Sequence, residues 1–275
     1  MIPTFAARLT TRNFGRVARL LDRCGSTNDE AAAWARAALG DQGAGRAPEG
    51  AVVIAAEQSG GRGRLGRRWH SPPGESLYLS LVLRPRIAPH LAPPLALVAA
   101  VALAEAVEAA GAAPELKWPN DVLLDGRKLA GILIEMATSG ATQGHVIEHV
   151  IEHVIVGIGV NLRTTVFPEE LGGRATSLAL ALPGLSTDDA RLDPLAFGAA
   201  LLGYLEVWYH RFLDEGPAPV VAAWKRRARL LGRHVTVHSG NEHHSGVAED
   251  LDPDGALVLR LDSGARLRVV AGEIG

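Results

Sequence analysis

The chain has 275 residues, a formal net charge of -2, 47% hydrophobic and 21% charged residues, and a single cysteine. This composition predicts a soluble protein with one large domain, or with one large and one small domain. The lone Cys24 excludes an internal disulfide framework. Thirty acidic residues against 28 basic ones argue against bulk electrostatic binding of nucleic acid, and no signal peptide or unbroken apolar span is evident, so a cytoplasmic location is expected.

The N-terminal part of the chain shows helix and strand signals around an unusual basic segment. Residues 25–39, "GSTNDEAAAWARAAL", predict a helix. Three polar residues could cap it: Ser26, Thr27 and Asn28. Residues 51–61 and 76–85 predict strands, so the arginine-rich segment between them is expected to be a loop on a rigid scaffold.

The middle of the chain predicts a helix over residues 93–110, followed by a strand, an Asp-Gly turn and a second strand over residues 115–136. The next segment, "HVIEHVIEHVIVGIGVNL", contains "VIEH" twice in tandem and favours a strand. Four inserted residues preserve the alternation of a strand, so the repeat is expected to lengthen a hairpin without inverting its faces. Its three histidines would lie about 13 Å apart from one to the next in a strand, so no metal ligand is assigned there. They are His145, His149 and His153.

The C-terminal part predicts helices over residues 195–216 and 220–232, the second one stopped by glycine. After Gly232 the sequence changes to short alternating strands separated by Ser-Gly and Pro-Asp-Gly turns, which indicates a small β-barrel. We therefore expect a domain boundary near residue 231.

The segment "QSGGRGRLGRRWHSPP" (58–73) places four arginines within seven residues. Glycine lets backbone N–H groups wrap an anion, and guanidinium groups bind phosphate or carboxylate in bidentate fashion. The spacing does not match the phosphate loop of NTPases, and its fit to the dinucleotide fingerprint through Gly61, Gly63 and Gly66 is accidental. Four like charges repel unless an anion offsets them, so a binding role is favoured over a solvated basic loop.

Two further clusters supply groups that suit an anionic substrate. "KWPND" places Lys117, Asn120 and Asp121 beside a stiffening proline, although a strand-end turn with a packed tryptophan is the alternative. In "GRKLAGILIE", Lys128 precedes an apolar strand. Most such lysines are solvated, but one beside the other clusters could neutralise a reacting carboxylate or phosphate.

Five motifs, taken in order, closely resemble those of the biotin protein ligase family over about residues 20–275: "STND", "QSGGRGRLGRRW", "KWPND", "RKLAGILIE" and "VGIGVNL". The resemblance implies an α/β (α+β) fold, with a class II synthetase and biotin ligase-like mixed sheet with helices over residues 1–231. A small SH3-like β-barrel would then occupy residues 232–275. It also implies two steps: biotin and ATP form biotinyl-5′-AMP with Mg²⁺ present, and a lysine of the biotin carboxyl carrier domain of acetyl-CoA carboxylase or a related carboxylase then takes the biotin.

The resemblance assigns roles to matched positions. Biotin is expected to be bound by Ser26, Thr27, Asn28, Gln58, Gly61, Arg62, Lys128 and Gly131. ATP and the adenylate are expected to be bound by Arg64, Arg67, Trp69, Lys117, Asn120, Asp121 and Asn161. The catalytic cations are expected to be Lys128, Arg64 and Lys117, and Asp121 is the candidate for a contact to Mg²⁺.

Two alternatives stay open. A lipoate-type protein ligase shares the fold, but its arginine–serine–triple-glycine loop is absent here, and Gln58 suits a ureido ring better than a dithiolane. A nucleic-acid-binding module would show salt-sensitive DNA affinity without biotin transfer. About 25 residues precede "STND", too few for the winged helix of some relatives, so no DNA and no membrane partner is expected, while a homodimer stays open.

Overall fold

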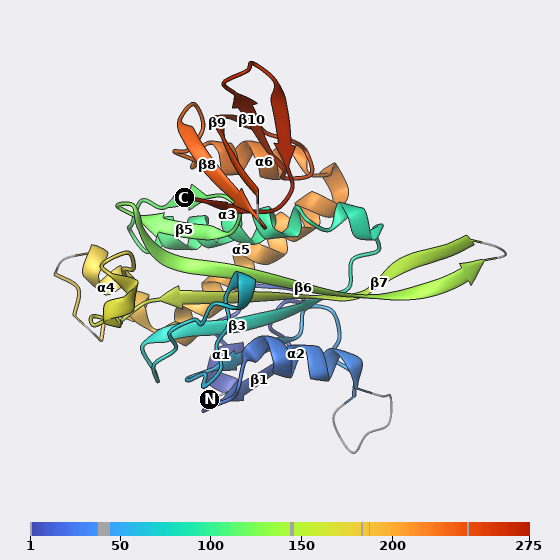
Figure 1. Cartoon of the computed structure of the whole chain (residues 1–275). Coiled ribbons are helices and arrows are strands. Elements are labelled where there is room, and N and C mark those ends of the chain that lie inside the picture. The colour runs from blue at the N-terminus through green and yellow to red at the C-terminus, as the bar shows by residue number, and fades with distance from the viewer. Residues whose placement is uncertain (1, 38–44, 144–145, 183, 187, 241) are drawn as a thin grey trace.

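The computed structural model describes residues 2–37, 45–143, 146–182, 184–186, 188–240 and 242–275. It contains a seven-stranded mixed sheet with helices on both faces and a second, five-stranded antiparallel sheet near the C-terminus (Figure 1). The predicted α/β class, with a mixed sheet, helices and a separate C-terminal β element, is confirmed.

The large sheet is built from strands that lie between residues 18 and 161. They are β1 (Ala18–Leu21), β2 (Val52–Ala55), β3 (Ser76–Leu83), β4 (Glu115–Lys117), β5 (Asp121–Leu124), β6 (Arg127–Gln143) and β7 (Val146–Asn161). Their order is β1-β2-β3-β7-β6-β5-β4, with β1 and β2 parallel and the other neighbours antiparallel. Strands β6 and β7 continue past the sheet as a two-stranded ribbon (Figure 1).

Four of the helices were predicted, one of them with a later end, whereas the two short helices over residues 2–6 and 178–181 were not. They are α1 (Ile2–Ala6), α2 (Thr27–Arg36), α3 (Leu95–Ala109), α4 (Leu178–Ala181), α5 (Pro194–Glu215) and α6 (Ala218–Lys225), with short 3₁₀ turns η1 (Arg64–Gly66), η2 (Pro89–Leu91), η3 (Glu169–Leu171) and η4 (Ala190–Leu192). The helix predicted over 220–232 ends at Lys225. Beyond it, the Arg227 carbonyl accepts a hydrogen bond from Leu116 of β4, and Gly232 donates to Ala248, so these backbone groups serve the sheets instead of a helix.

Helix α3 is the buried core helix. Among the described residues, the stretch Pro89–Ala109 alone is long and apolar enough to cross a membrane by length and composition, with a mean hydropathy of 1.7. However, 72% of that stretch is buried within the fold, where α3 packs against α5, β5 and β6.

The two faces of the large sheet are covered differently, and this difference positions the site. Successive side chains of a strand point to opposite faces. Helices α3 and α5 cover one face and form the main core with residues such as Ile54 of β2. On the other face, α2 packs Trp34 against Val53, Val82 and Ile155. Beyond Ile155 this second face stays open, and the pocket described below lies there.

The segment before the Asp-Gly turn forms two strands, whereas the sequence predicts one. The chain reverses at Trp118–Asn120, where Pro119 has no N–H for a ladder bond, and β4 then pairs with β5 so that Lys117 lies opposite Asp121. The predicted Asp-Gly turn is confirmed, because Asp125 and Gly126 have φ values of 49° and 72°.

The "VIEH" repeat lies on β7, as predicted for a strand, but its pleat is interrupted. The pairing of β6 with β7 shifts between Ala137, opposite His153, and Thr138, opposite Ile151. Glu152 is therefore the extra residue of a β-bulge, which changes the alternation by one position. The repeat unit over residues 150–153 thus does not preserve the strand alternation that was expected of it.

The histidines of the repeat can be described in part. His145 and the side chain of His149 lie outside the described residues. His153 is 2% exposed, and burial lowers the pKa of its imidazole. The structure thus describes one of these three side chains, and it is a buried residue at the base of the ribbon.

The second sheet begins at His234, just after Gly232, where the sequence predicted a change to short alternating strands. Its strands are β8 (His234–Ser239), β9 (Glu242–Leu251), β10 (Leu257–Leu261), β11 (Arg266–Val269) and β12 (Glu273–Ile274), in the order β11-β10-β9-β8-β12. Leu257 and Leu259 belong to the main core, and Trp118 Nε1 donates to the Gly255 carbonyl at 3.0 Å. These contacts bring β12 to the edge of the pocket.

Candidate active site

One cavity of about 580 Å³ lies on the open face of the large sheet. Small-molecule sites commonly have volumes of about 300–1,000 Å³. All predicted site residues except Gly61 line it: Ser26, Thr27, Asn28, Gln58, Arg62, Arg64, Arg67, Trp69, Lys117, Asn120, Asp121, Lys128, Gly131 and Asn161. Segments that are far apart in the sequence therefore meet around one space.

The polar half of the pocket consists of Ser26, Thr27, Asn28 and Gln58, from the start of α2 and the loop after β2. Gln58 Oε1 accepts hydrogen bonds from Thr27 N at 2.8 Å and from Thr27 Oγ1 at 3.1 Å. Ser26 is the N-cap residue but makes no side-chain cap bond, so Gln58 satisfies the first helical amide in its place. The polar start of the helix is thus held by a side chain from another segment.

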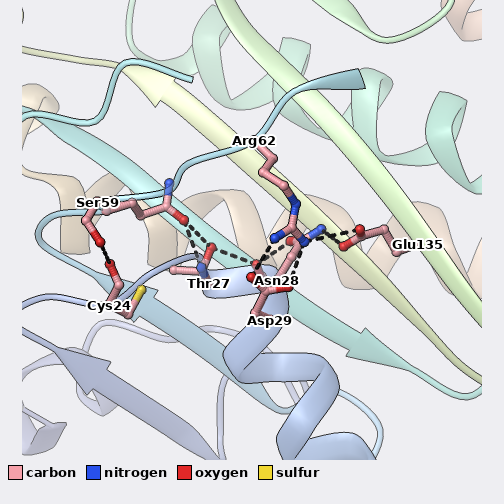
Figure 2. A network of polar contacts seen from close by, with 9 residues as sticks. Cys24, Thr27, Asn28, Asp29, Ser59, Arg62 and Glu135 are labelled. Atoms are coloured by element: carbon pink, nitrogen blue, oxygen red, sulfur yellow. Dashed lines mark hydrogen bonds and ion pairs between the residues drawn. The ribbon is translucent and has the colours of Figure 1, made fainter. Parts of the chain in front are cut away.

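Ser80, a fully buried residue of β3, links the side chains of Thr27 and Asn28. Sequence analysis did not identify it as a site residue. Its hydroxyl donates to Asn28 Oδ1 at 2.6 Å, and its oxygen lies 2.8 Å from Thr27 Oγ1. Thr27 Oγ1 also contacts Gln58 Oε1. The Ser80 and Thr27 hydroxyl groups therefore supply two protons for three oxygen–oxygen contacts. Asn28 Nδ2 donates in turn to Glu135 at 2.7 Å (Figure 2). The Asn28 amide is therefore bonded to the protein at both of its polar atoms.

Two glycines of "VGIGVNL" make room for the pocket floor, a role that sequence reasoning missed. A Cβ atom at Gly157 would lie 2.2 Å from Asn28 Oδ1, and one at Gly159 would lie 2.5 Å from Trp69 Nε1. Gly131 of β6 approaches the same tryptophan, because its Cβ would lie 3.2 Å from Cζ3. The indole of Trp69 thus lies flat against backbone on the sheet.

The arginine loop, residues 61–69, closes on itself. Trp69 N donates to the Gly61 carbonyl at 2.9 Å, and Gly63 N donates to the Arg67 carbonyl at 2.7 Å. Gly61 does not line the pocket; a Cβ there would lie 2.6 Å from Ser71 Oγ, so its role is close packing. At the tip, Leu65 has a φ of 55° and is 76% exposed, a strained conformation for a leucine.

Besides Arg62, six cationic residues line the cavity, and we call them its cationic half: Arg64, Arg67, Arg68, Lys117, Lys128 and Arg174. Lys128 lies beside Asp121 and the indole of Trp69. Its Nζ is 2.6 Å from Asp121 Oδ1 and 5.5 Å from the centre of the Trp69 ring. Since two of the three lysines of the chain line this cavity, it has a marked excess of positive charge.

The C-terminal sheet holds the arginines of this cationic half. Arg64 Nη1 donates to the Gly272 carbonyl at 3.2 Å and to Asn120 Oδ1 at 3.3 Å, and Arg67 forms an ion pair with Glu273 of β12. Burial lowers the pKa of the Arg64 guanidinium. Glu273 and Gly272 were not predicted, because the short end "AGEIG" shows no motif beyond a single acidic residue.

Two predicted asparagines are also partly engaged by backbone. Asn161 Nδ2 donates to the Thr176 carbonyl at 2.9 Å, and Asn120 Nδ2 donates to the Ile132 carbonyl at 2.7 Å. Both side chains are thus fixed in orientation at the pocket wall.

Comparison with known proteins identifies the family. Residues 36–161 match the Biotin/lipoate A/B protein ligase family, and residues 230–274 match the Biotin protein ligase C terminal domain. The Biotin--[acetyl-CoA-carboxylase] ligase of Paracoccus denitrificans is 37% identical over 258 residues, which cover 93% of this chain and 98% of that protein. The chain belongs to the biotin protein ligase family. The family membership expected from the five motifs is thereby confirmed.

Other relatives of this biotin protein ligase family member differ in length. The Biotin--[acetyl-CoA-carboxylase] ligase of Mycobacterium tuberculosis is 35% identical over 82% of this chain and 79% of its own length. The Bifunctional ligase/repressor BirA of Bacillus subtilis is 35% identical over 80% of this chain, and the match spans 64% of that relative's length. The solved structure of the Aquifex aeolicus biotin protein ligase in complex with biotin and ATP is 25% identical, with a TM-score of 0.74 over 94% of this chain and 98% of that one.

Proposed function

We propose that this chain is an ATP-dependent ligase that activates biotin as biotinyl-5′-AMP and transfers the biotinyl group to a lysine of a biotin carboxyl carrier protein. The observation that carries the proposal is that Lys128 lines one cavity together with the polar half and with the other residues of the cationic half. A relative from Paracoccus denitrificans is named for this activity, and an Aquifex aeolicus neighbour is a complex with biotin and ATP.

The polar half supplies the groups that a ureido ring needs. Thr27, Asn28 and Gln58 offer hydroxyl and amide groups whose orientation is fixed by Ser80 and by one another. The Asn28 and Gln58 amides each have a second N–H that these protein contacts do not use, and a ligand with matching acceptors would bond it, whereas an apolar ligand would not. The neighbouring Trp69 supplies apolar surface for the rest of the ligand.

The first step places the biotin carboxylate beside Lys128. An oxygen of the carboxylate attacks the α-phosphorus of ATP, a new O–P bond forms, and pyrophosphate leaves. Both reacting groups are anionic, so Lys128, with Arg64, Arg67 and Lys117 nearby, would lower their repulsion in the transition state. Lys128 would leave Asp121 to do so.

The second step transfers the biotinyl group. The neutral amine of the acceptor lysine attacks the anhydride carbonyl, AMP leaves from the acyl carbon, and the amine loses a proton. Until that lysine arrives, the arginine loop has to keep water and other amines from the adenylate.

The cavity also fits a Mg²⁺ ion that is carried mainly by ATP. Magnesium commonly binds phosphates, water and one or two carboxylates. Two carboxylates, Asp121 and Glu273, line the cavity, and among the described residues no group of three or more potential protein ligands forms a closed metal cage. Asp121 would contact the ion, which would supply charge neutralisation for the leaving pyrophosphate.

One experiment tests the activity. The protein is incubated with biotin, Mg-ATP and the biotin-carrier domain of a carboxylase, and the carrier is expected to gain the mass of one biotinyl group. Replacing biotin with lipoate tests the lipoate-ligase alternative, which the first family name includes. Transfer of lipoate but not of biotin would overturn the proposal.

Several finer predictions belong to the same proposal. They are the division into a catalytic domain (1–231) and a barrel domain (232–275), a cytoplasmic location, a homodimer as an open state, and the absence of DNA and membrane partners. The roles of the individual site residues are likewise proposed.

A further inference from the structure

A three-way ion pair lies beside the polar half of the pocket and connects three elements (Figure 2). Arg62, at the start of the arginine loop, places Nη1 2.5 Å from Asp29 Oδ2 and Nη2 2.7 Å from Asp29 Oδ1. The same Nη2 donates to Glu135 Oε1 at 3.3 Å. The loop is thereby joined to the first turn of α2 and to β6.

The geometry of this contact distinguishes it from an ordinary surface pair. The Arg62–Asp29 contact is bidentate, which is the strong and directional form of this interaction. The hydrogen bond from the Arg62 guanidinium lowers the pKa of the Asp29 carboxyl. Both groups are partly exposed, with side-chain exposures of 38% for Arg62 and 59% for Asp29, so salt should weaken the contact.

The partners of Arg62 are themselves held by the buried network. Glu135 Oε2 accepts from Asn28 Nδ2 at 2.7 Å, and Asn28, which is 4% exposed, is fixed by Ser80. Asp29 follows Asn28 in the same helical turn. Arg62 therefore binds to a stiff part of the pocket wall.

Backbone contacts also hold the loop on both sides of Arg62: Gly60 N donates to the Gly25 carbonyl at 2.8 Å, and Gly63 N donates to the Arg67 carbonyl at 2.7 Å. Arg62 pairs with Arg68 in a single β-bridge, and Trp69 N donates to Gly61. The ion pair adds a side-chain restraint on Arg62 to these backbone contacts, and it therefore affects the position of Trp69 and of the arginines that follow.

We propose that Asp29 is a positioning residue that, with Glu135, holds the arginine loop over the polar half of the pocket before any nucleotide binds. It thereby sets how long biotin and its adenylate stay bound. The identity of these ligands rests on the proposed function, whereas the effect on the loop does not. The opposite role is also testable: if Asp29 and Glu135 merely competed with the ligand for Arg62, their removal would tighten binding.

The first experiment needs no ligand. Ligand-free protein is digested briefly with trypsin, and cleavage after Arg62, Arg64, Arg67 and Arg68 is followed by mass. The Asp29→Asn variant should be cut about five-fold faster in this loop, which is the effect of losing a well-formed but partly exposed ion pair. Raising the salt concentration should speed cleavage of the wild type more than that of the variant, which keeps only the longer contact between Arg62 and Glu135.

The matched control is Glu30→Gln. Like Asp29→Asn, it removes a carboxylate from the first turn of α2 and therefore removes a favourable interaction with the helix dipole. Unlike Asp29, Glu30 makes none of the contacts to Arg62. It should be cut at the wild-type rate. Asp29→Glu, which keeps the charge, should restore part of the protection.

The second experiment measures biotin alone, with tryptophan fluorescence as the signal. Asp29→Asn should raise the dissociation rate about five-fold and leave the association rate nearly unchanged, since a positioning residue acts on the closed state. Equal loop cleavage in Asp29→Asn and wild type would overturn the proposal, and so would slower release of biotin. If the wild type binds no biotin, the proposed function fails, while the cleavage comparison still decides the role of Asp29.

Discussion

The polar half and the cationic half of the pocket satisfy their polar groups in different ways. In the polar half, side chains of α2, β3 and the loop after β2 bond one another over distances of 2.6–3.1 Å. In the cationic half, Arg64 and Arg67 bond to Gly272 and Glu273 at the C-terminal sheet, and in the proposed reaction the triphosphate would replace these partners. One half is preorganised, and the other has to exchange its partners.

This difference predicts different effects of substitution. A preorganised site loses little freedom when it binds, so changes in the polar half should affect ligand affinity and protein stability together. Partly exposed ion pairs contribute little to stability, so changes in the cationic half should affect the reaction and leave the fold nearly unchanged. The following predictions test this comparison, from the largest expected effect to the smallest.

Lys128→Ala should lower the rate of biotinyl-AMP formation by about 10²–10³-fold, because it removes the cation between two anionic reactants. Single-turnover formation of the adenylate measures this rate. Lys225→Ala, which removes a lysine paired with Asp250 outside the cavity, is the control and should keep the wild-type rate. A Lys128→Ala rate close to that of the wild type would remove this residue from the mechanism.

Cys24 reports on the polar half without a substitution. Burial, followed by the nearby charges of Glu30 and Asp29, raises the pKa of its thiol from 9.0 to about 11. At pH 8 the native thiolate should therefore be about 100-fold scarcer than at a pKa of 9.0, and alkylation should be slower by a similar factor. Alkylation in denaturant gives the reference rate. A native rate equal to that reference would show that this half opens readily.

Arg64→Gly should release the adenylate about ten-fold faster, because it removes charge-assisted hydrogen bonds and adds backbone freedom to the loop. The measurement is the biotin gained by an unrelated lysine-rich protein incubated with the variant, biotin and Mg-ATP. Leu65→Gly is the matched control, since it adds backbone freedom at a position with a φ of 55° without removing a charge. If the bystander gains no more biotin than with wild type while adenylate still forms, Arg64 does not retain the intermediate.

Ser80→Ala should weaken biotin binding about five-fold and destabilise the fold by about 1–3 kcal/mol, because Asn28 Oδ1 loses a buried donor. Isothermal titration and denaturant unfolding measure the two effects. Ser76→Ala is the control on the same strand: Ser76 is 1% exposed and bonds Thr164, outside the polar half. It should lose stability and keep its biotin affinity. Equal affinity loss in both variants would mean that the effect is general and not specific to the polar half.

Deletion of residues 150–153 should change ligase activity by less than about two-fold, since the ribbon lies outside both halves of the pocket. The deletion leaves one "VIEH" unit, so the residues that form the bulge and the buried histidine are replaced by identical ones. Steady-state biotin transfer measures the outcome. Lost activity in a chain that still unfolds cooperatively would assign the ribbon a role in the reaction.

Local patterns were enough to predict most elements and most of the pocket. The alternating and helical patterns predicted β3, α3 and α5, and "LDGRK" predicted the turn before β6. The predictions failed where backbone groups found partners elsewhere, as in α6, which ends at Lys225 because the Arg227 carbonyl and the Gly232 N–H bond to the two sheets. The bulge at Glu152 was also missed, because two identical repeat units give no signal that one of them is irregular.

By itself, the sequence determined the types of group at the site: the arginines and glycines of the loop, the lysines, and the polar start of α2. Only the tertiary structure decided which of them meet. Ser80 is one of two serines in an alternating strand until β3 passes beneath α2, and Glu273 is an isolated acid until β12 reaches Arg67, 206 positions away in the chain. Such contacts depend on strand register and on the packing of one sheet against another, which a local pattern does not encode.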